Sequence, residues 1–564
     1  MKKKLLALLL GLTLCLSLAA CGSDAAETVT LTVAASPTPH AEILNQCVPI
    51  LAEQGIELVV NEYSDYVVPN TAVEDGDEDA NYFQHLPYLE EFNETRGTHL
   101  VSVAGVHIEP MGIYAGRVSS LEDLPDGAVI AVPNDATNEG RALLLLEAQG
   151  CLGGMGTSGM VCAYDPMADG EKMLVGGFMR ELIETLYARG FTGPRTPPES
   201  WRSKYMCWTN FRPEGLKLVL DELVVKEGVE VRFFTRVIDA EADPQEGVVQ
   251  GVVTSSVEGY RYIRAKTFID CTGDAILAGL AGAKYRQAGR DTEHIMPATL
   301  PGLFSGVDWD KPDLNTQTPE AVELIEKEYA AGNFEQCDRL LVGLSCSGNT
   351  FGYLNGGHIF DLDALSVESL TKGMMQGRRI ALQNLAFLRK YSPNCENLEL
   401  VYTAPVMGVR ESRRIVGEYE LTFADYLARR QFPDQIGLFN KYVDVHPYSC
   451  SKEDFDRHLV EKRKSGILSP GECFGIPYGI LVPKGWKNFW VAGRCNSSDV
   501  MVHGIIRVMP SSAMMGQAAG TAAVQSIQTG QAANRLDTAQ LVETLRENGA
   551  NLPQRELSKS MTVA

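Results

Sequence analysis

The stretch LLLLEAQGCLGGMGTSGMV, residues 143–161, decides the fold class of the longer part of this 564-residue chain. Its four leucines predict a short buried strand, and the glycines that follow, Gly154, Gly156 and Gly159, form the pattern G-x-G-x-x-G. That pattern is typical of a dinucleotide-binding loop when it connects a strand to a helix. By itself it is a weak signal, so its meaning depends on the sequence that precedes and follows it.

The chain begins with a segment that has the features of a secretory signal. Three lysines precede an apolar run from Leu5 to Leu18, which is too short to span a membrane and ends in the small-residue box LAAC. This box resembles the cleavage site of bacterial lipoproteins, which implies a signal peptide over residues 1–21 and a diacylglycerol group on Cys21. We therefore expect a lipid-anchored protein on the extracytoplasmic face of the cell membrane. The alternative is an apolar helix with an incidental cysteine.

Charge is distributed unevenly along the chain. The net charge is −22, yet residues 22–150 contain 22 Asp and Glu against three Arg, whereas residues 151–564 contain 50 acidic and 44 basic residues. Such asymmetry predicts a domain boundary, and the length predicts roughly two to four domains. Acidity argues against nucleic acid as a partner, because phosphate binding needs clustered Lys and Arg.

The 13 cysteines are scattered singly, and none has CxxC or Cys/His metal-ligand spacing. This usage predicts neither a disulfide framework nor a metal site. It is typical of a cytosolic enzyme with reduced thiols, and it conflicts with an exported N-terminus.

From Thr28 to about Leu146 the sequence predicts a strand, a helix, a second strand, a turn-rich passage and another helix, which is an α/β pattern. The helix after the first strand follows a loop, so its free amides are placed either for a ligand carboxylate or for ordinary capping. This part of the sequence closely resembles methionine-binding lipoproteins of the NlpA type, which are the receptors of ABC importers. The matching stretches are ASPTPHAEIL (35–44), YSDYVVPNTAV (63–73), DANYFQHLPYL (79–89) and SLEDLPDGAVIAVPNDATNEGRALLLLE (120–147).

This resemblance implies a methionine site in a periplasmic-binding-protein-like first lobe, residues 22–146. Aromatic rings would enclose the apolar side chain of the ligand, and polar groups would hold its amino-acid end. Carried over by motif, the pocket residues are Tyr66, Phe83, His85 and Tyr88, with Asn138 and Arg141 at the amino-acid end. Each also has an ordinary alternative, as core, loop or solvated helix residue. The family pattern stops after Glu147. The second lobe of such a receptor is therefore expected to be absent, and the receptor-like part is incomplete.

From Cys151 onward the chain resembles FAD-dependent oxidoreductases of the heterodisulfide-reductase-subunit-A-like group. Matching stretches include KTFIDCTGDAILAGLAGAKY (266–285), MGVRESRRIVGEYELT (407–422), GWKNFWVAGRC (485–495) and MMGQAAGTAA (514–523), in the family's order. The resemblance implies an FAD-binding Rossmann-like α/β domain with an α+β substrate domain over residues 147–564. It also implies FAD as cofactor and a small-molecule substrate that the sequence does not identify.

The same family accounts for the glycines of the opening stretch. The fingerprint should stand about 30 residues before the acid that ends the second strand, and that acid is Glu147. Residues 108–135 contain no glycine-rich turn that opens a helix. We therefore predict that G-x-G-x-x-G at 154–159 is a coincidental match, and that the first strand, phosphate loop and helix of the FAD fold are missing.

The junction also predicts how the chain arose. Residues 143–150 fit both families, and a seam inside a shared stretch favours a chimaeric chain, formed by recombination or by misjoined sequence fragments. The alternative is a natural fusion of whole domains, which would need a polar or Pro/Gly-rich linker that the sequence lacks.

Site residues of the oxidoreductase part follow from the resemblance. Strand ends, a glycine loop and a small-residue helix are expected to contact the cofactor, although simple turns and helix packing would produce the same patterns. The predicted cofactor-binding residues are Glu147, Gly153, Gly154, Thr157, Asp274, Gly493, Arg494, Gly516 and Gly520.

Candidates for chemistry beside the flavin are His503 as acid or base, Arg507 and Arg410 as anion-binding groups, and Cys151 as a redox thiol. The stretch around Arg410 is more often an internal salt-bridge network. Larger relatives carry 4Fe–4S clusters, but the cysteine spacing does not support one here. Two rival interpretations remain: a membrane-anchored methionine-binding lipoprotein with a passenger C-terminal part, and a true membrane-tethered flavoenzyme.

Overall fold

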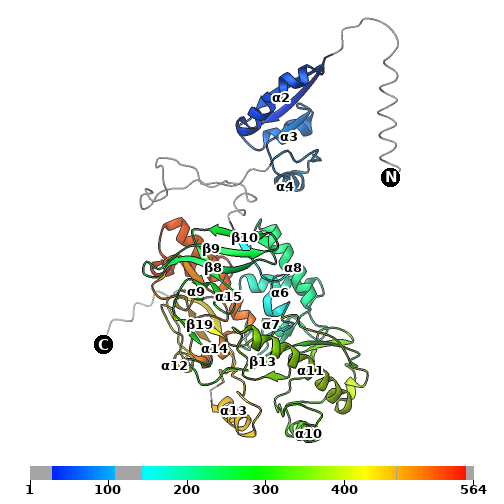
Figure 1. Cartoon of the computed structure of the whole chain (residues 1–564), viewed down its shortest axis with the longest axis vertical. Coiled ribbons are helices and arrows are strands. Elements are labelled where there is room, and N and C mark those ends of the chain that lie inside the picture. The colour runs from blue at the N-terminus through cyan, green and yellow to red at the C-terminus, as the bar shows by residue number, and fades with distance from the viewer. Residues whose placement is uncertain (1–27, 108–142, 465–466, 554–564) are drawn as a thin grey trace. The chain divides into compact units, whose positions relative to one another are not determined.

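The structure is a computed structural model that describes residues 28–107, 143–464 and 467–553 and divides into two compact units (Figure 1). The division lies between Tyr114 and Ala115, in a stretch outside the described residues. Strand β4 (Leu144–Leu146), in the stretch that fits both families, is part of the second unit.

The first unit is a parallel three-stranded sheet of order β2–β1–β3 with helices between the strands. The central strand ends in the buried Val33, Ala34 and Ala35, as expected for a strand covered on both faces. The α/β prediction is confirmed, but the predicted turn-rich passage contains a short helix and a strand. The elements are β1 (Val29–Ala35), an irregular turn (Pro37–Ala41), α2 (Glu42–Ala52), β2 (Ile56–Glu62), α3 (Val68–Asp75), β3 (Ala80–Tyr82) and α4 (Leu86–Arg96).

The second unit combines many short strands with helices of very different length. Its helices are α6 (Phe178–Ala188), α7 (Glu199–Arg202), α8 (Pro213–Lys226), α9 (Ile276–Leu280), α10 (Pro319–Ala330), α11 (Val367–Tyr391), α12 (Phe423–Leu427), α13 (Lys452–Lys464), α14 (Val500–Ile506), α15 (Met509–Thr529) and α16 (Thr538–Glu547). In Figure 1 the β8–β9–β10 sheet lies at one end of this unit, and α10 and α13 lie at the other.

The remaining strands of the unit are β5 (Ala163–Tyr164), β6 (Thr209–Asn210), β7 (Glu230–Arg232), β8 (Arg236–Asp243), β9 (Val248–Ser256), β10 (Gly259–Arg264), β11 (Phe268–Asp270), β12 (Tyr285–Gln287), β13 (Ala298–Thr299), β14 (Gly302–Ser305), β15 (Ser345–Cys346), β16 (Phe351–Leu354), β17 (His358–Ile359), β18 (Glu399–Thr403), β19 (Arg413–Ile415), β20 (Gln435–Phe439), β21 (Phe474–Pro477) and β22 (Phe489–Val491).

Two kinds of sheet coexist in the second unit. The pairs β4–β7 and β11–β22 are parallel, whereas the other ladders between its described strands are antiparallel. Parallel strands joined through helices belong to α/β folds, and antiparallel sheets such as β15–β16–β14–β18 to α+β arrangements. The predicted combination of an α/β part and an α+β part is confirmed.

Helix α15 is central to the packing of the second unit. It contacts α6, α16, β20 and β11, and the side chains of Ala518, Ala519 and Ala522 are fully buried. Small side chains let neighbouring elements approach the helix closely, which explains an alanine-rich helix in a core.

Candidate functional site

The glycine loop after β4 does not open a helix. Residues Gly154–Gly156 form one turn of 3-10 helix, and the next α-helix begins only at Phe178. Gly153 and Gly154 have φ values of 98° and 51°, in the left-handed region that favours glycine. The prediction that these glycines form a loop behind a strand is confirmed.

Glu147 directly follows β4. Its Oε1 accepts a hydrogen bond from the backbone N–H of Gln149 at 2.8 Å, so the carboxylate turns back onto its own loop. In the same loop, Thr157 donates its hydroxyl to the carbonyl of Leu152 at 2.6 Å. Contact of Glu147 or Thr157 with a ribose or phosphate stays a prediction.

In each parallel pair of the second unit, both strands have an outer edge without a ladder among the described strands. Leu143 and Glu147 bond to β7, so the backbone groups of Leu144 and Leu146 point away from it. In the same way β11 bonds to β22 through Phe268 and Asp270, which turns the backbone of Ile269 to the opposite side. No third strand joins either pair in the described part of the chain.

The structure brings Asp274 and Arg494 together. Arg494 donates Nη2 to Asp274 Oδ1 at 2.7 Å, and the Ser412 hydroxyl reaches the same oxygen at 2.6 Å. Next to this ion pair Gly493 has a φ of 89°, and a Cβ added at Gly493 would lie 3.6 Å from the Ser512 hydroxyl of α15. The predicted strand-end residues therefore meet the first turn of α15.

The glycines of α15 face open space. A Cβ built on Gly516 or on Gly520 would meet no atom within 4 Å, and the same holds for Gly154. The two helix positions are four residues apart and share one face. Helix packing therefore does not explain these two glycines.

The described residues fit one part of an FAD molecule. The face of α15 at Gly516 and Gly520 is not covered by other described residues, and its contact with a flavin ring stays a prediction. A glycine turn that opens the first helix of a βαβ unit, which normally holds the pyrophosphate, is not among the described residues. We therefore derive no chemical step through the flavin.

The predicted catalytic residues fall into different environments. His503 is fully buried and its Nε2 lies 3.1 Å from the Arg410 carbonyl; burial, with Arg414 and Arg507, holds the pKa of His503 well below its usual value. Arg507 donates Nη2 to Asp444 Oδ2 at 3.1 Å. Cys151 Sγ lies 3.3 Å from the Ser158 hydroxyl. Catalytic roles for these residues stay predictions.

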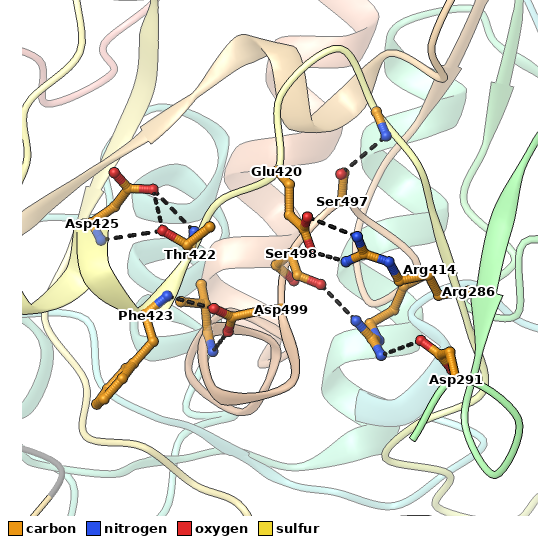
Figure 2. A network of polar contacts seen from close by, with 12 residues as sticks. Arg286, Asp291, Arg414, Glu420, Thr422, Phe423, Asp425, Ser497, Ser498 and Asp499 are labelled. Atoms are coloured by element: carbon orange, nitrogen blue, oxygen red, sulfur yellow. Dashed lines mark hydrogen bonds and ion pairs between the residues drawn. The ribbon is translucent and has the colours of Figure 1, made fainter. Parts of the chain in front are cut away.

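A polar network around Arg414 explains part of the arginine-rich stretch. Arg414 is 1% exposed, donates to the Ser498 carbonyl at 2.7 Å and pairs with Asp291 at 3.2 Å (Figure 2). Close by, Arg286 donates to Glu420 at 2.8 Å. These contacts tie β19, which contains Arg414, to the loop after β12 and to the loop before α14, so Arg414 has a structural role.

A chain of four buried or half-buried groups was not singled out from the sequence. Asp338 lies 3.0 Å from His358 Nδ1, His358 Nε2 lies 2.8 Å from His446 Nδ1, and His446 Nε2 lies 3.3 Å from Asp444. The members are 20, 88 and 2 residues apart along the chain. In the sequence His446 is followed by Pro447 and Tyr448, and this local pattern does not predict which residue would bond to the His446 ring.

In the first unit, four predicted aromatic and loop residues can be located. The ring centroids of Tyr66 and Phe83 are 5.8 Å apart, and Tyr88 is 6.2 Å from each of them. Phe83 is buried, Tyr66 is 54% exposed, and His85 directly precedes α4. The structure thus brings the three predicted rings together. Asn138, Arg141 and Cys21 lie outside the described residues.

Metal-type clusters of three or more His, Cys, Asp or Glu are absent from the residues that the structure describes. The 11 cysteines in this part are free thiols. None of the described helices is both long and apolar enough to cross a membrane.

Comparison with known proteins identifies both parts of the chain. A family profile for FAD dependent oxidoreductases matches residues 128–545, and one for NlpA lipoproteins matches residues 31–157. The two matches overlap at residues 128–157, which include the stretch 143–150.

Among curated proteins, the methionine-binding lipoprotein MetQ of Bacillus subtilis is 48% identical over 139 residues, which are 24% of this chain and 51% of the relative. Membrane lipoprotein TpN32 of Treponema pallidum is 33% identical over 234 residues, 40% of this chain and 86% of the relative. The chain thus spans about half the length of the MetQ protein.

Among solved structures, a putative lipoprotein from Ruminococcus gnavus is 35% identical and covers 36% of this chain and 61% of that one, with a TM-score of 0.19. This score is too low to support a structural argument, so the assignment rests on the sequence matches. The chain belongs to the FAD dependent oxidoreductase family over most of its length and carries part of an NlpA lipoprotein at residues 31–157, which overlap the start of that region.

Proposed function

We propose that this chain is an FAD-dependent oxidoreductase body whose cofactor binding is weakened because its first βαβ element is replaced by lipoprotein sequence. The observation that carries the proposal is the pair of open strand edges. β4 and β11, like their partners β7 and β22, each pair on one side only among the described strands, and all four are parallel strands of the kind that a central sheet contains. A strand missing between such pairs leaves two edges of this type.

The replaced element matters because of the charge of the cofactor. A glycine turn and a helix N-terminus normally neutralise the two negative charges of the pyrophosphate. The ring side of the site would be formed by Asp274, Gly493 and Gly520, of which Gly520 faces open space on α15. We expect the ring side to bind flavin weakly and the phosphate side to contribute little.

Flavin content tests the proposal directly. The purified full chain is expected to be colourless or to carry far less than one FAD per chain, measured by flavin absorbance after denaturation. Titration with FAD is expected to give weak binding that differs little from that of riboflavin, since the phosphates add few contacts. Full FAD occupancy would contradict the proposal and would make Gly154, Gly156 and Gly159 the fingerprint.

The second candidate function is methionine binding by the first unit, together with an ABC importer. It is favoured by the ring cluster of Tyr66, Phe83 and Tyr88, in which Tyr66 is half exposed. A pocket with one lobe leaves most of the ligand surface in water, so burial of the ligand contributes little to the free energy of binding. We expect no methionine binding tighter than about 0.1 mM by calorimetry. Submicromolar affinity would favour the receptor function.

Attachment to a membrane through Cys21 is part of the same proposal. The NlpA match and the lipoprotein relatives support it. Substitution Cys21→Ala is expected to abolish incorporation of radiolabelled lipid and to release the chain from membranes. Cys47→Ala is the matched control, because Cys47 is far from the LAAC box. Unchanged lipid labelling in Cys21→Ala would rule the anchor out.

A further inference from the structure

The sheet of β10, β9 and β8 at one end of the second unit has two edges of different character (Figure 1). The β8 edge is irregular, because its register with β9 shifts after Val237 and again after Glu241. The same strand carries the acidic residues Asp239, Glu241 and Asp243. Bulges and charges are the usual features that keep an edge strand from pairing with another chain. The β8 edge is thus protected.

The β10 edge lacks this protection. β10 pairs with β9 in one regular register, from Gly259 opposite Ser256 to Arg264 opposite Gly251, and contains neither a proline nor a bulge. No other described strand joins its outer edge, and every residue of β10 except Ile263 is exposed. Regular, uncovered edges are the ones that accept a further strand.

The two-residue turn between β9 and β10 determines which backbone groups of β10 point outward. Gly259 and Ser256 close the turn as a hydrogen-bonded pair, and hydrogen-bonded and non-bonded pairs then alternate along the hairpin. Gly259 and every second residue after it therefore bond to β9. The N–H and C=O groups of Tyr260, Tyr262 and Arg264 point to the open side.

The side chains along this open edge have a self-complementary pattern of charge. Tyr260, Tyr262 and Arg264 share one face of β10, with Glu258 two residues before them and Lys266 two residues after them. All five residues are exposed. Because the acid stands at one end of the row and the bases stand at the other, two antiparallel copies of this strand place opposite charges next to each other.

Antiparallel pairing of two β10 strands around Tyr262 uses the outward backbone groups of both copies. It places Tyr262 opposite Tyr262 of the second copy, and Tyr260 opposite Arg264 of the second copy, which is a favourable cation–π pair. Pairing centred on Arg261 instead would place two arginines directly opposite each other, which is unfavourable. The charge pattern therefore favours the register around Tyr262.

The side chains of the single chain leave this register free. The Tyr262 hydroxyl bonds to Glu241 of β8, so the ring lies across the sheet and not beyond its edge. A Cβ at Gly251 of β9 would collide with the Tyr262 ring, so glycine makes room for it. Glu258 pairs with Arg261 of its own chain at 2.7 Å, but both side chains are more than half exposed, and such a pair contributes little.

We propose that the β10 edge binds a second copy of this chain, antiparallel and around Tyr262, so that two three-stranded sheets form one continuous sheet. The interface is isologous, and Glu258 of each copy faces Lys266 of the other. Two short strands bury less surface than the about 1,200–2,000 Å² of a stable complex, so we expect a reversible dimer with a dissociation constant of about 10–100 µM. The inference goes beyond the proposed function and does not depend on FAD.

Sedimentation equilibrium of the purified full chain at increasing concentration tests the dimer. Lys266→Glu places two acids opposite each other at both ends of the interface and is expected to weaken dimerisation by about five- to tenfold. Adding Glu258→Lys to this variant is expected to restore the wild-type affinity. Asp239→Lys, a charge reversal on the opposite edge of the same sheet, is the matched control and is expected to change nothing.

Two outcomes of the sedimentation experiment would overturn the proposal. One is a chain that stays monomeric up to about ten times the expected dissociation constant. The other is a double variant that dimerises no better than Lys266→Glu alone. A purely structural role of Lys266 in its own chain predicts no restoration by Glu258→Lys.

Hydrogen exchange of individual backbone amides, measured by mass spectrometry, tests the edge itself. The amides of Tyr260, Tyr262 and Arg264 are expected to exchange fast in dilute solution and slowly at concentrations where the chain is dimeric. The amides of Arg261 and Ile263 are expected to be slow in both, because they bond to β9. Fast exchange of the first three amides in the dimer would place the interface elsewhere and overturn the proposal. Slow exchange in the monomer would assign the edge to another segment of this chain, with the same consequence.

A backbone variant gives an independent measurement. Tyr260→Pro removes an N–H group that points away from β9, so the hairpin of the single chain keeps its ladder while the dimer loses a hydrogen bond at each end. It is expected to abolish dimerisation, whereas the control Tyr260→Ala keeps the N–H group and is expected to weaken it less. Wild-type dimerisation of a folded Tyr260→Pro chain would overturn the proposal. If this variant does not fold, the charge reversals and the amide exchange decide.

Discussion

Strands β4 and β22 are both short, apolar and parallel, and they lie in the same unit, yet they are buried to very different degrees. Phe489, Trp490 and Val491 of β22 are fully buried, whereas the leucines of β4 are partly exposed and the neighbouring Leu143 is 51% exposed. Each of the two has one strand partner among the described strands, β11 for β22 and β7 for β4, but β22 also packs on α15. An apolar run therefore indicates a strand that is suited to burial. The residues that bury it must come from other segments of the chain.

The largest effect is expected from restoring a strand beside β4. Replacing residues 1–142 with a strand, G-x-G-x-x-G turn and helix from a related enzyme is expected to strengthen FAD binding by about three or more powers of ten. Several charge-assisted hydrogen bonds to the pyrophosphate would be regained, each worth about 1.5–3 kcal/mol. FAD titration of both chains measures the change.

A graft in which the turn reads A-x-A-x-x-A is the control for the previous experiment, because it restores the strand but hinders close approach of the phosphates. Equal FAD affinity in the original chain and in the intact graft would show that β4 does not lack a neighbour.

The second test compares side chains of the two strands directly. Phe489→Ala is expected to lower the free energy of unfolding of the second unit by about 3–5 kcal/mol, because it leaves a cavity in a fully buried strand. Leu145→Ala is expected to cost about 1 kcal/mol, because its side chain is already partly in water. Urea denaturation followed by tryptophan fluorescence measures both, and equal losses would contradict the comparison.

The smallest effect is expected at two helix glycines. Gly377→Ala on α11 places a Cβ 2.5 Å from Leu300, so we expect a loss of about 1–3 kcal/mol. Gly516→Ala on α15 meets no atom, so helix propensity alone is expected to raise stability by up to about 1 kcal/mol. In the grafted protein Gly516→Ala is expected to weaken FAD binding. A stability loss at Gly516 would show that this face of α15 is covered.

Much of the architecture was predictable because it is local. The alternation of strands and helices from Val29 to Arg96 follows from apolar spacing, although α3 and β3 are too short to give a clear periodicity. The loop at Gly153 and Gly154 was predictable because its glycines stand behind a strand that ends in an acid. Asp274 and Arg494 were predicted as separate strand ends, but their ion pair was not.

The sequence by itself determined the family composition of this protein, the alternation of strands and helices in the first unit apart from α3 and β3, and the glycine loop behind β4. These properties depend on residues close together in the chain, where spacing carries the information. Only the tertiary structure decided which groups meet: that Arg414 is tied to Asp291 while Arg410 donates to the Pro297 carbonyl, and that His358 and His446 share a hydrogen bond across 88 residues. Contacts between distant segments depend on how every intervening element packs, and no local pattern records that.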